Sequence, residues 1–156
     1  MNYPTIGWLR GLFDAPPLEV PDHTTVASHS IDSRTLRHGD LFWAIRAQRD
    51  GHDFVADALA KGACAAVVNQ EWFESAQAEL LRGKLLTVGD TTDALQSAAR
   101  HWRTRIQCNV IGITGSNGKT TTKDIATHLL GARFKTAGTA GNLNNELGVP
   151  LTLLGM

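Results

Sequence analysis

Residues 112–121 carry the clearest chemical pattern in the sequence, Gly-Ile-Thr-Gly-Ser-Asn-Gly-Lys-Thr-Thr. A polyphosphate is held by backbone N–H groups curled around its oxygens, by the positive amino end of a helix, by a lysine, and by a hydroxyl on Mg²⁺. Gly115 and Gly118 remove Cβ atoms that would block a close approach of the backbone, while Lys119 supplies the charge and Thr120 the hydroxyl. The pattern therefore predicts a nucleotide phosphate site.

The spacing departs from the strict GxxxxGK[ST] pattern, because Ile113 stands where that pattern has glycine. The alternative is a glycine-rich turn with an incidental lysine. We expect a strand over residues 110–113 and a helix from Lys119 to Leu130 with Gly131 at its C′ position, and this context favours the phosphate site. Lys119 and Thr120 are the expected catalytic groups, with Thr120 as the Mg²⁺ ligand. The residues expected to contact ATP are Gly115, Ser116, Asn117, Gly118, Lys119, Thr120 and Thr121.

The elements that would position this loop alternate between strand and helix along most of the chain. Short apolar runs predict buried strands over residues 40–45, 65–68 and 85–88. A helix is expected over residues 51–62. Four prolines make the first thirty residues look irregular. The fold class is α/β with a largely parallel sheet, and its cleanest helix begins at Asp90 or Thr91 with one apolar stripe of Leu95, Ala98, Ala99 and Trp102.

Composition and charge exclude several classes of protein. Fifteen Lys plus Arg balance fifteen Asp plus Glu, which argues against a general nucleic-acid binder. With 42% hydrophobic and 19% charged residues the chain is globular, and no apolar run approaches the roughly 18 residues of a membrane span. Cys64 and Cys108 form no CxxC, so a disulfide framework is not expected and a reducing cytoplasm is. The six histidines show no metal spacing.

The loop at residues 112–121 resembles the ATP loop of the Mur ligase superfamily, the amide-forming enzymes of peptidoglycan precursor synthesis. Residues 141–154, Gly-Asn-Leu-Asn-Asn-Glu-Leu-Gly-Val-Pro-Leu-Thr-Leu-Leu, look like the corresponding segment of the MurF type. Residues 31–34, 39–42 and 50–54 are similar to the uridine-nucleotide domain of MurE- and MurF-type ligases.

This resemblance implies an ATP-dependent carboxylate–amine ligase with ATP and Mg²⁺ as its cofactors. The γ-phosphate of ATP would pass to the terminal carboxylate of UDP-N-acetylmuramoyl tripeptide, and the amine of D-alanyl-D-alanine would attack the acyl phosphate. Serine and asparagine also make ordinary surface turns, which is the alternative for these positions. The substrate contacts that the resemblance implies are Ser33, Arg34, Asn142, Asn144 and Asn145.

A charged break at residues 82–84 suggests two units. Residues 1–83 are expected to be an N-terminal UDP-substrate-binding domain, and residues 84–156 the truncated beginning of a central P-loop ATP-binding domain, with the C-terminal domain absent. The loop between Ala44 and Gly51 is one residue shorter than the family pattern, so we expect it to be reshaped. We expect this chain alone to be inactive in ligation. The full-length protein is expected to be a monomer without nucleic-acid partners or membrane insertion, and self-association of the fragment is left open.

Three alternatives to this function stay open. They are a MurE-type amino-acid ligase, another P-loop kinase or NTPase, and a non-catalytic module that binds a UDP-sugar or a partner protein. The Asn-Asn-Glu-Leu-Gly-Val-Pro run argues against the first. His52 is expected to be a hydrogen-bonding residue at a helix entry and Trp102 a core residue, whereas a solvated helix face is expected for Arg100, Arg103 and Arg105.

Overall fold

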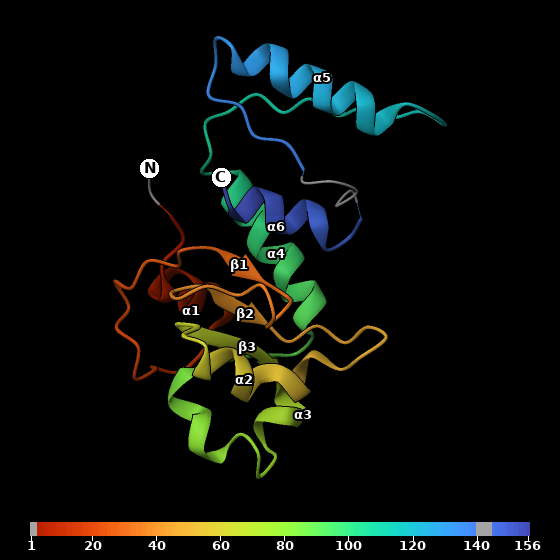
Figure 1. The fold of residues 1–156 in the computed structure, drawn as a ribbon. Helices are drawn as coiled ribbons and strands as arrows, with labels where there is room; N and C mark the ends of the chain where they lie inside the picture. The colour runs from red at the N-terminus through yellow and green to blue at the C-terminus, as the bar shows by residue number, and fades with distance from the viewer. Residues whose placement is uncertain (1–2, 140–144) are drawn as a thin grey trace.

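The computed structural model describes residues 3–139 and 145–156, and its centre is a four-stranded parallel sheet of order β1-β2-β3-β4 (Figure 1). Each strand pairs with the next in sequence, with Leu41 opposite His29 and Ala65, and Val67 opposite Leu86. No helix within the described ranges is long and apolar enough to cross a membrane. The elements are α1 (Ile6–Phe13), β1 (His29–Ser30), β2 (Leu41–Trp43), the 3-10 helix η1 (Gly51–Phe54), α2 (Val55–Ala60), β3 (Ala65–Asn69), α3 (Gln70–Phe73), the 3-10 helix η2 (Glu79–Lys84), β4 (Leu85–Val88), α4 (Thr91–Arg103), α5 (Lys119–Gly131) and α6 (Gly148–Leu154).

The sheet is buried on both faces, as expected for parallel strands covered by helices. Side chains alternate, so that Trp43 and Val67 enter one apolar core and Phe42 and Val68 enter the other. The first core is closed by α1, α4 and α6, and the second by α2 with partly buried residues of α3. The predicted α/β class with a parallel sheet is therefore confirmed.

Helix α4 matches its prediction closely. Asp90 is the N-cap, and its carboxylate accepts hydrogen bonds of 2.8 Å from the backbone N–H groups of Thr92 and Asp93. The predicted stripe is buried and includes Trp102, which is 5% exposed. At the other end of the helix, Arg103 donates to the backbone oxygens of Ile106 and Cys108 and so satisfies carbonyls beyond the last turn.

Two other helical predictions need adjustment. The helix expected over residues 51–62 is η1 followed by α2, and Gly62 lies just beyond its end with a φ of +98°. Helix α1 was not expected among the prolines of the first thirty residues. It begins after Thr5, whose side chain accepts from the N–H of Trp8, and it buries Ile6 and Leu9.

The boundary expected after residue 83 falls inside one packed unit. Strand β4 pairs with β3 over Leu85 to Val88, and α4 packs on the same sheet. The charged residues that suggested a linker form η2, whose Gly83 carbonyl accepts a hydrogen bond from the Glu19 N–H. A polar surface turn between two elements of one sheet therefore looked like a linker in the sequence.

The strand expected over residues 110–113 is absent from the described structure. Val110 and Ile111 are 59% and 66% exposed, and no strand among the described residues pairs with this segment. A lone extended segment gains no ladder hydrogen bonds, so it has no reason to become a strand. Helix α5 forms as expected, but Gly131 is its last residue rather than a left-handed C′ residue, and Ala132 caps it.

Candidate functional site

The phosphate loop lies directly before α5, as its sequence requires. Gly115 and Gly118 have φ angles of +149° and +76°, and these positive values explain why glycine is needed at both positions. Gly118 is also the N-cap of α5 and provides no side chain to cap the helix. The amino end of α5 therefore has no side-chain cap from that residue, as suits a helix end that receives an anion.

Lys119 turns back over this loop. Its Nζ donates to the backbone oxygen of Gly115 and approaches that of Ser116 at 3.5 Å. The ammonium group is thus held against the loop by its carbonyls, and phosphate oxygens would replace these carbonyls as its partners. Thr120 follows in the first turn of the same helix and is exposed. The loop, the helix end and the lysine together fit a polyphosphate.

The phosphate loop and Ser33–Arg34 lie on separate parts of the molecule. Figure 1 shows α5 apart from the sheet, with α4 and α6 between them. No residue of α5 is buried, and Ile125 and Leu129 are exposed on its surface. The phosphate loop and the Ser33–Arg34 turn are therefore two candidate half-sites that lie apart in this structure.

Ser33 and Arg34 follow β1 at the carboxyl end of the sheet, where ligands of parallel sheets commonly bind. Ser33 is buried, whereas the Arg34 side chain is 84% exposed. Arg34 forms a two-point ion pair with Asp32, with Nε–Oδ1 and Nη2–Oδ2 distances of 2.9 and 2.7 Å. Hydrogen bonds from Arg34 lower the pKa of Asp32 to about 2. The turn is thus preorganised by its own charges.

Lys61 extends this site and was not singled out from the sequence. Its Nζ donates to the Ser33 carbonyl at 3.1 Å and to Asp57 Oδ2 at 2.8 Å. Hydrogen bonds from Lys61 and then Ser33 lower the pKa of the Asp57 carboxyl. The signal that could have found Lys61 is the i, i+4 spacing of Asp57 and Lys61 on one helix.

The Asp50-Gly51-His52 motif mainly stabilises the local structure. The Asp50 carboxylate caps η1 by accepting from the His52 N–H at 3.0 Å, and it contacts His52 Nδ1 at 2.5 Å. His52 Nε2 accepts from the Asn69 N–H at 3.1 Å, so Nδ1 carries the proton and donates to Asp50. This geometry supports the expectation that His52 is a helix-entry hydrogen-bonding residue. A Cβ on Gly51 would lie 2.6 Å from Ile45 N, which accounts for the glycine.

The shortened loop between Ala44 and Gly51 is closed by charged side chains. Arg46 and Asp50 form an isolated antiparallel bridge, and their side chains meet at 3.1 Å. Arg46 Nη2 also reaches Glu71 of α3 at 2.9 Å. Beneath the loop, Thr91 Oγ1 donates to the Ala44 carbonyl at 2.9 Å. The loop is thereby tied to two helices at the carboxyl edge of the sheet.

Asn145 has a local role that the sequence did not reveal. Its Oδ1 accepts from the N–H groups of Gly148 at 2.8 Å and Leu147 at 3.3 Å, at the beginning of α6. The expected helix after the asparagine segment is present, although Pro150 is its third residue rather than its first. Asn142 and Asn144 lie outside the described residues.

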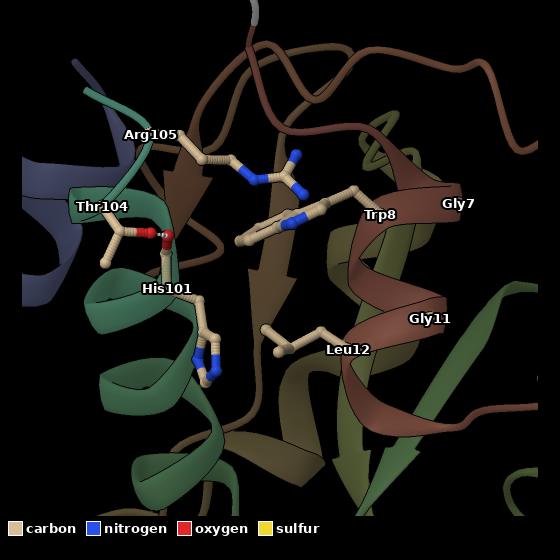
Figure 2. A pocket seen from close by; sticks show the side chains of 7 residues that line it. All are labelled: Gly7, Trp8, Gly11, Leu12, His101, Thr104 and Arg105. Atoms are coloured by element: carbon tan, nitrogen blue, oxygen red, sulfur yellow. Dashed lines mark hydrogen bonds between the residues drawn. The ribbon is translucent and has the colours of Figure 1, made fainter. Parts of the chain in front are cut away.

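A shallow cleft of about 490 Å³ lies between α1 and α4 (Figure 2). Arg105 lies over the Trp8 ring at 5.5 Å, and Trp8 meets Trp102 edge-on at 5.3 Å. Arg105 is exposed, as expected for a solvated face, and it also covers an aromatic side chain. The residues that line the cleft include none of the predicted site residues; they are Gly7, Trp8, Gly11, Leu12, His101, Thr104 and Arg105.

Other nucleophile and metal chemistry has little support in the described ranges. They hold no group of three or more His, Cys, Asp or Glu side chains able to bind a metal ion. Burial raises the pKa of the Cys64 thiol to about 11, which disfavours a thiolate there.

Comparison with known protein families agrees with this geometry. Residues 25–103 match the model described as "Mur ligase family, catalytic domain", which is more than half of the chain, and residues 113–156 match the "Mur ligase middle domain". The chain belongs to the Mur ligase family. Its two matches meet between α4 and the phosphate loop, so the family division follows the packing of the sheet rather than the charged break at residues 82–84.

Two similar curated proteins of the Mur ligase family carry the same name. The UDP-N-acetylmuramoyl-tripeptide--D-alanyl-D-alanine ligase of Bacillus subtilis is 38% identical over 86% of this chain and 29% of its own length. The enzyme of the same name from Synechocystis is 43% identical over 79% of this chain and 26% of its own length. The chain thus spans less than a third of these curated relatives.

Solved Mur ligase structures resemble the fold over most or all of its length. A crystal structure of MurF from Acinetobacter baumannii superposes with a TM-score of 0.78 at 33% identity, and the match covers 100% of this chain and 34% of that one. MurF from Thermotoga maritima in complex with ADP gives a TM-score of 0.67 at 35% identity, covering 83% of this chain and 29% of that one.

Proposed function

We propose that these residues belong to an ATP-dependent ligase that joins D-alanyl-D-alanine to UDP-N-acetylmuramoyl tripeptide in peptidoglycan precursor synthesis. The observation that carries the proposal is the glycine loop with Lys119 at the uncapped amino end of α5, in a Mur ligase chain whose similar relatives bear this name. The ADP complex of the Thermotoga relative supports ATP as the nucleotide. The nucleotide substrates favour the cytoplasm as the site of reaction.

The proposed reaction has two steps. The terminal carboxylate of the UDP-linked tripeptide attacks the γ-phosphorus of ATP, giving an acyl phosphate and ADP. The amine of D-alanyl-D-alanine then attacks the acyl carbon, loses a proton and expels inorganic phosphate, which leaves an amide. Neither step needs a covalent enzyme nucleophile.

The residues of this chain contribute positioning and positive charge. Loop N–H groups and Lys119 would stabilise the negative charge on the phosphoryl oxygens as they move between donor and acceptor. The Thr120 hydroxyl would hold Mg²⁺, which neutralises charge on the phosphate oxygens when bound. The other ATP contacts proposed are Gly115, Ser116, Asn117, Gly118 and Thr121.

The UDP-linked substrate is assigned to the carboxyl edge of the sheet. The exposed guanidinium of Arg34 can donate to a diphosphate, and Lys61 adds a second positive charge beside Ser33. We propose that residues 1–103 form this substrate unit and that residues 113–156 belong to the ATP-binding unit. Asn142 and Asn144 are proposed as substrate contacts, whereas Asn145 makes hydrogen bonds at the beginning of α6.

The experiment is a ligation assay with a complete ligase that contains this sequence. We expect phosphate release and amide formation only when ATP, Mg²⁺, UDP-N-acetylmuramoyl tripeptide and D-alanyl-D-alanine are all present. Phosphate release without the UDP-linked substrate would indicate a general NTPase, and addition of a single amino acid to the dipeptide precursor would indicate a MurE-type ligase. The 156-residue chain alone should not ligate, because acyl phosphate formation depends on groups positioned around both substrates.

A further inference from the structure

Helix α6 holds the buried residues by which the phosphate-loop half, residues 113–156, packs against the sheet unit, residues 1–103, in the part of the chain that the structure describes. Among the described residues from 113 onward, the buried ones are Gly148, Pro150 and Leu154, and all three belong to α6. Helix α5 buries none. The contact between the two halves of the described chain is therefore concentrated in α6 and the residues just before it.

The packing of α6 uses a helical stripe. Leu147, Leu151 and Leu154 follow i, i+4 and i+7 spacing and join the first apolar core. Leu154 is 1% exposed and belongs to the same core as Leu95 and Trp102 of α4. Figure 1 shows α6 lying along α4, at the side of β1. The stripe thus ends in the core of the sheet unit.

Polar contacts fix the beginning of α6. Asn145 Oδ1 accepts hydrogen bonds from the N–H groups of Leu147 and Gly148, and Gln96 of α4 donates to the Glu146 carbonyl at 3.3 Å. At its own amino end α4 is tied to the carboxyl end of β2 through Thr91. Helix α4 therefore connects the sheet edge to the start of α6.

We infer that α6 is the anchor that fixes the phosphate-loop half on the sheet unit, and that Leu154 and Asn145 are positioning residues rather than ligand contacts. The expected effect on kcat rests on the proposed function. The two half-sites must bring carboxylate and γ-phosphate into line, and a misplacement of about 1 Å can cost on the order of 100-fold in rate. A loosened anchor should therefore lower kcat while each substrate still binds its own half.

The first experiment compares Leu154→Ala with Val149→Ala in a complete ligase containing this sequence. Val149 is on the same helix but 41% exposed, so it controls for a generic change of α6. We expect Leu154→Ala to lower kcat for ligation by about tenfold with both substrate KM values within about twofold of wild type, and Val149→Ala to change neither. Equal kcat in the two variants, or a change in KM alone, would overturn the positioning role.

The second experiment measures amide hydrogen exchange in the 156-residue chain, and it also covers the case in which Leu154→Ala disturbs folding. Asn145→Ala should speed exchange of α6 amides by about fivefold, and Asn145→Ser should restore protection, because a serine hydroxyl can also accept from backbone N–H groups a few residues further on. Protection in β2 and β3 should not change. Fast exchange in Asn145→Ser, or unprotected α6 amides in wild type, would refute the proposal that α6 is an anchor. Protected α6 amides in a complete ligase that forms no amide product would refute the proposed function instead.

Discussion

Replacing Lys119 by alanine should weaken ATP binding. The side chain is half-buried and its Nζ is held over the loop by the carbonyls of Gly115 and Ser116. Loss of a hydrogen bond from a charged group costs about 1.5–3 kcal/mol, which raises Kd by roughly 10- to 150-fold, since 1.4 kcal/mol is tenfold. The loop residues around Lys119 are exposed, so salt screens the charge and the lower end of that range is expected at physiological ionic strength.

The assay is titration calorimetry of MgATP binding at low and physiological salt. Lys123→Ala is the matched control, because it removes the same charge from the next turn of α5, where Nζ donates to the Thr139 carbonyl at 2.7 Å. We expect this control to change Kd by no more than about twofold. Equal affinity in wild type and Lys119→Ala would refute the assignment. Equal losses in both lysine variants would show a general charge effect rather than a loop contact.

Three other predictions concern the sheet unit. Burial lowers the pKa of His29 from 6.5 to about 3, so below pH 6.5 the unfolded chain binds a proton that the folded chain does not. The free energy of unfolding should therefore decrease as the pH is lowered from 6.5 to 3. Denaturant titrations of His29→Gln should show a smaller decrease over the same pH range. Gly51→Ala should destabilise the chain by about 1–3 kcal/mol, because the new Cβ meets the Ile45 backbone, whereas Gly89→Ala, with open space around it, should not. Arg34→Ala in a complete ligase should raise KM for the UDP-linked substrate and leave that for ATP unchanged; a rise in the ATP KM would assign Arg34 to the other site.

The sequence predicted the elements whose signals are local. Asp90 and the stripe through Trp102 specify α4 by themselves, and the apolar run at residues 65–68 is long enough to indicate β3. Strand β1 has only two residues, His29 and Ser30, and it exists because β2 lies beside it. Such a strand depends on a neighbour, so no local pattern could indicate it.

The site predictions divide in the same way. Glycine spacing, Lys119 and the helix behind them indicated the phosphate loop, because each part acts on its immediate neighbours. His52 was expected to be a hydrogen-bonding residue at a helix entry, but the sequence could not name its partners. The bond from the Asn69 N–H to His52 and the close approach of Gly51 to the Ile45 backbone are packing requirements across the sheet. Asn145 looked like a ligand residue because its bond to the Gly148 N–H is recognised only once the beginning of α6 is known.

The sequential strand order has a consequence for how the chain folds. Each strand pairs with its immediate predecessor, so the ladder can grow in the direction of synthesis without waiting for distant segments. Helix α6 is different, because docking on α4 closes a long loop that contains the whole phosphate segment. We therefore expect residues 1–103 to fold first on the ribosome, leaving an apolar strip along α4 that α6 covers as a late step.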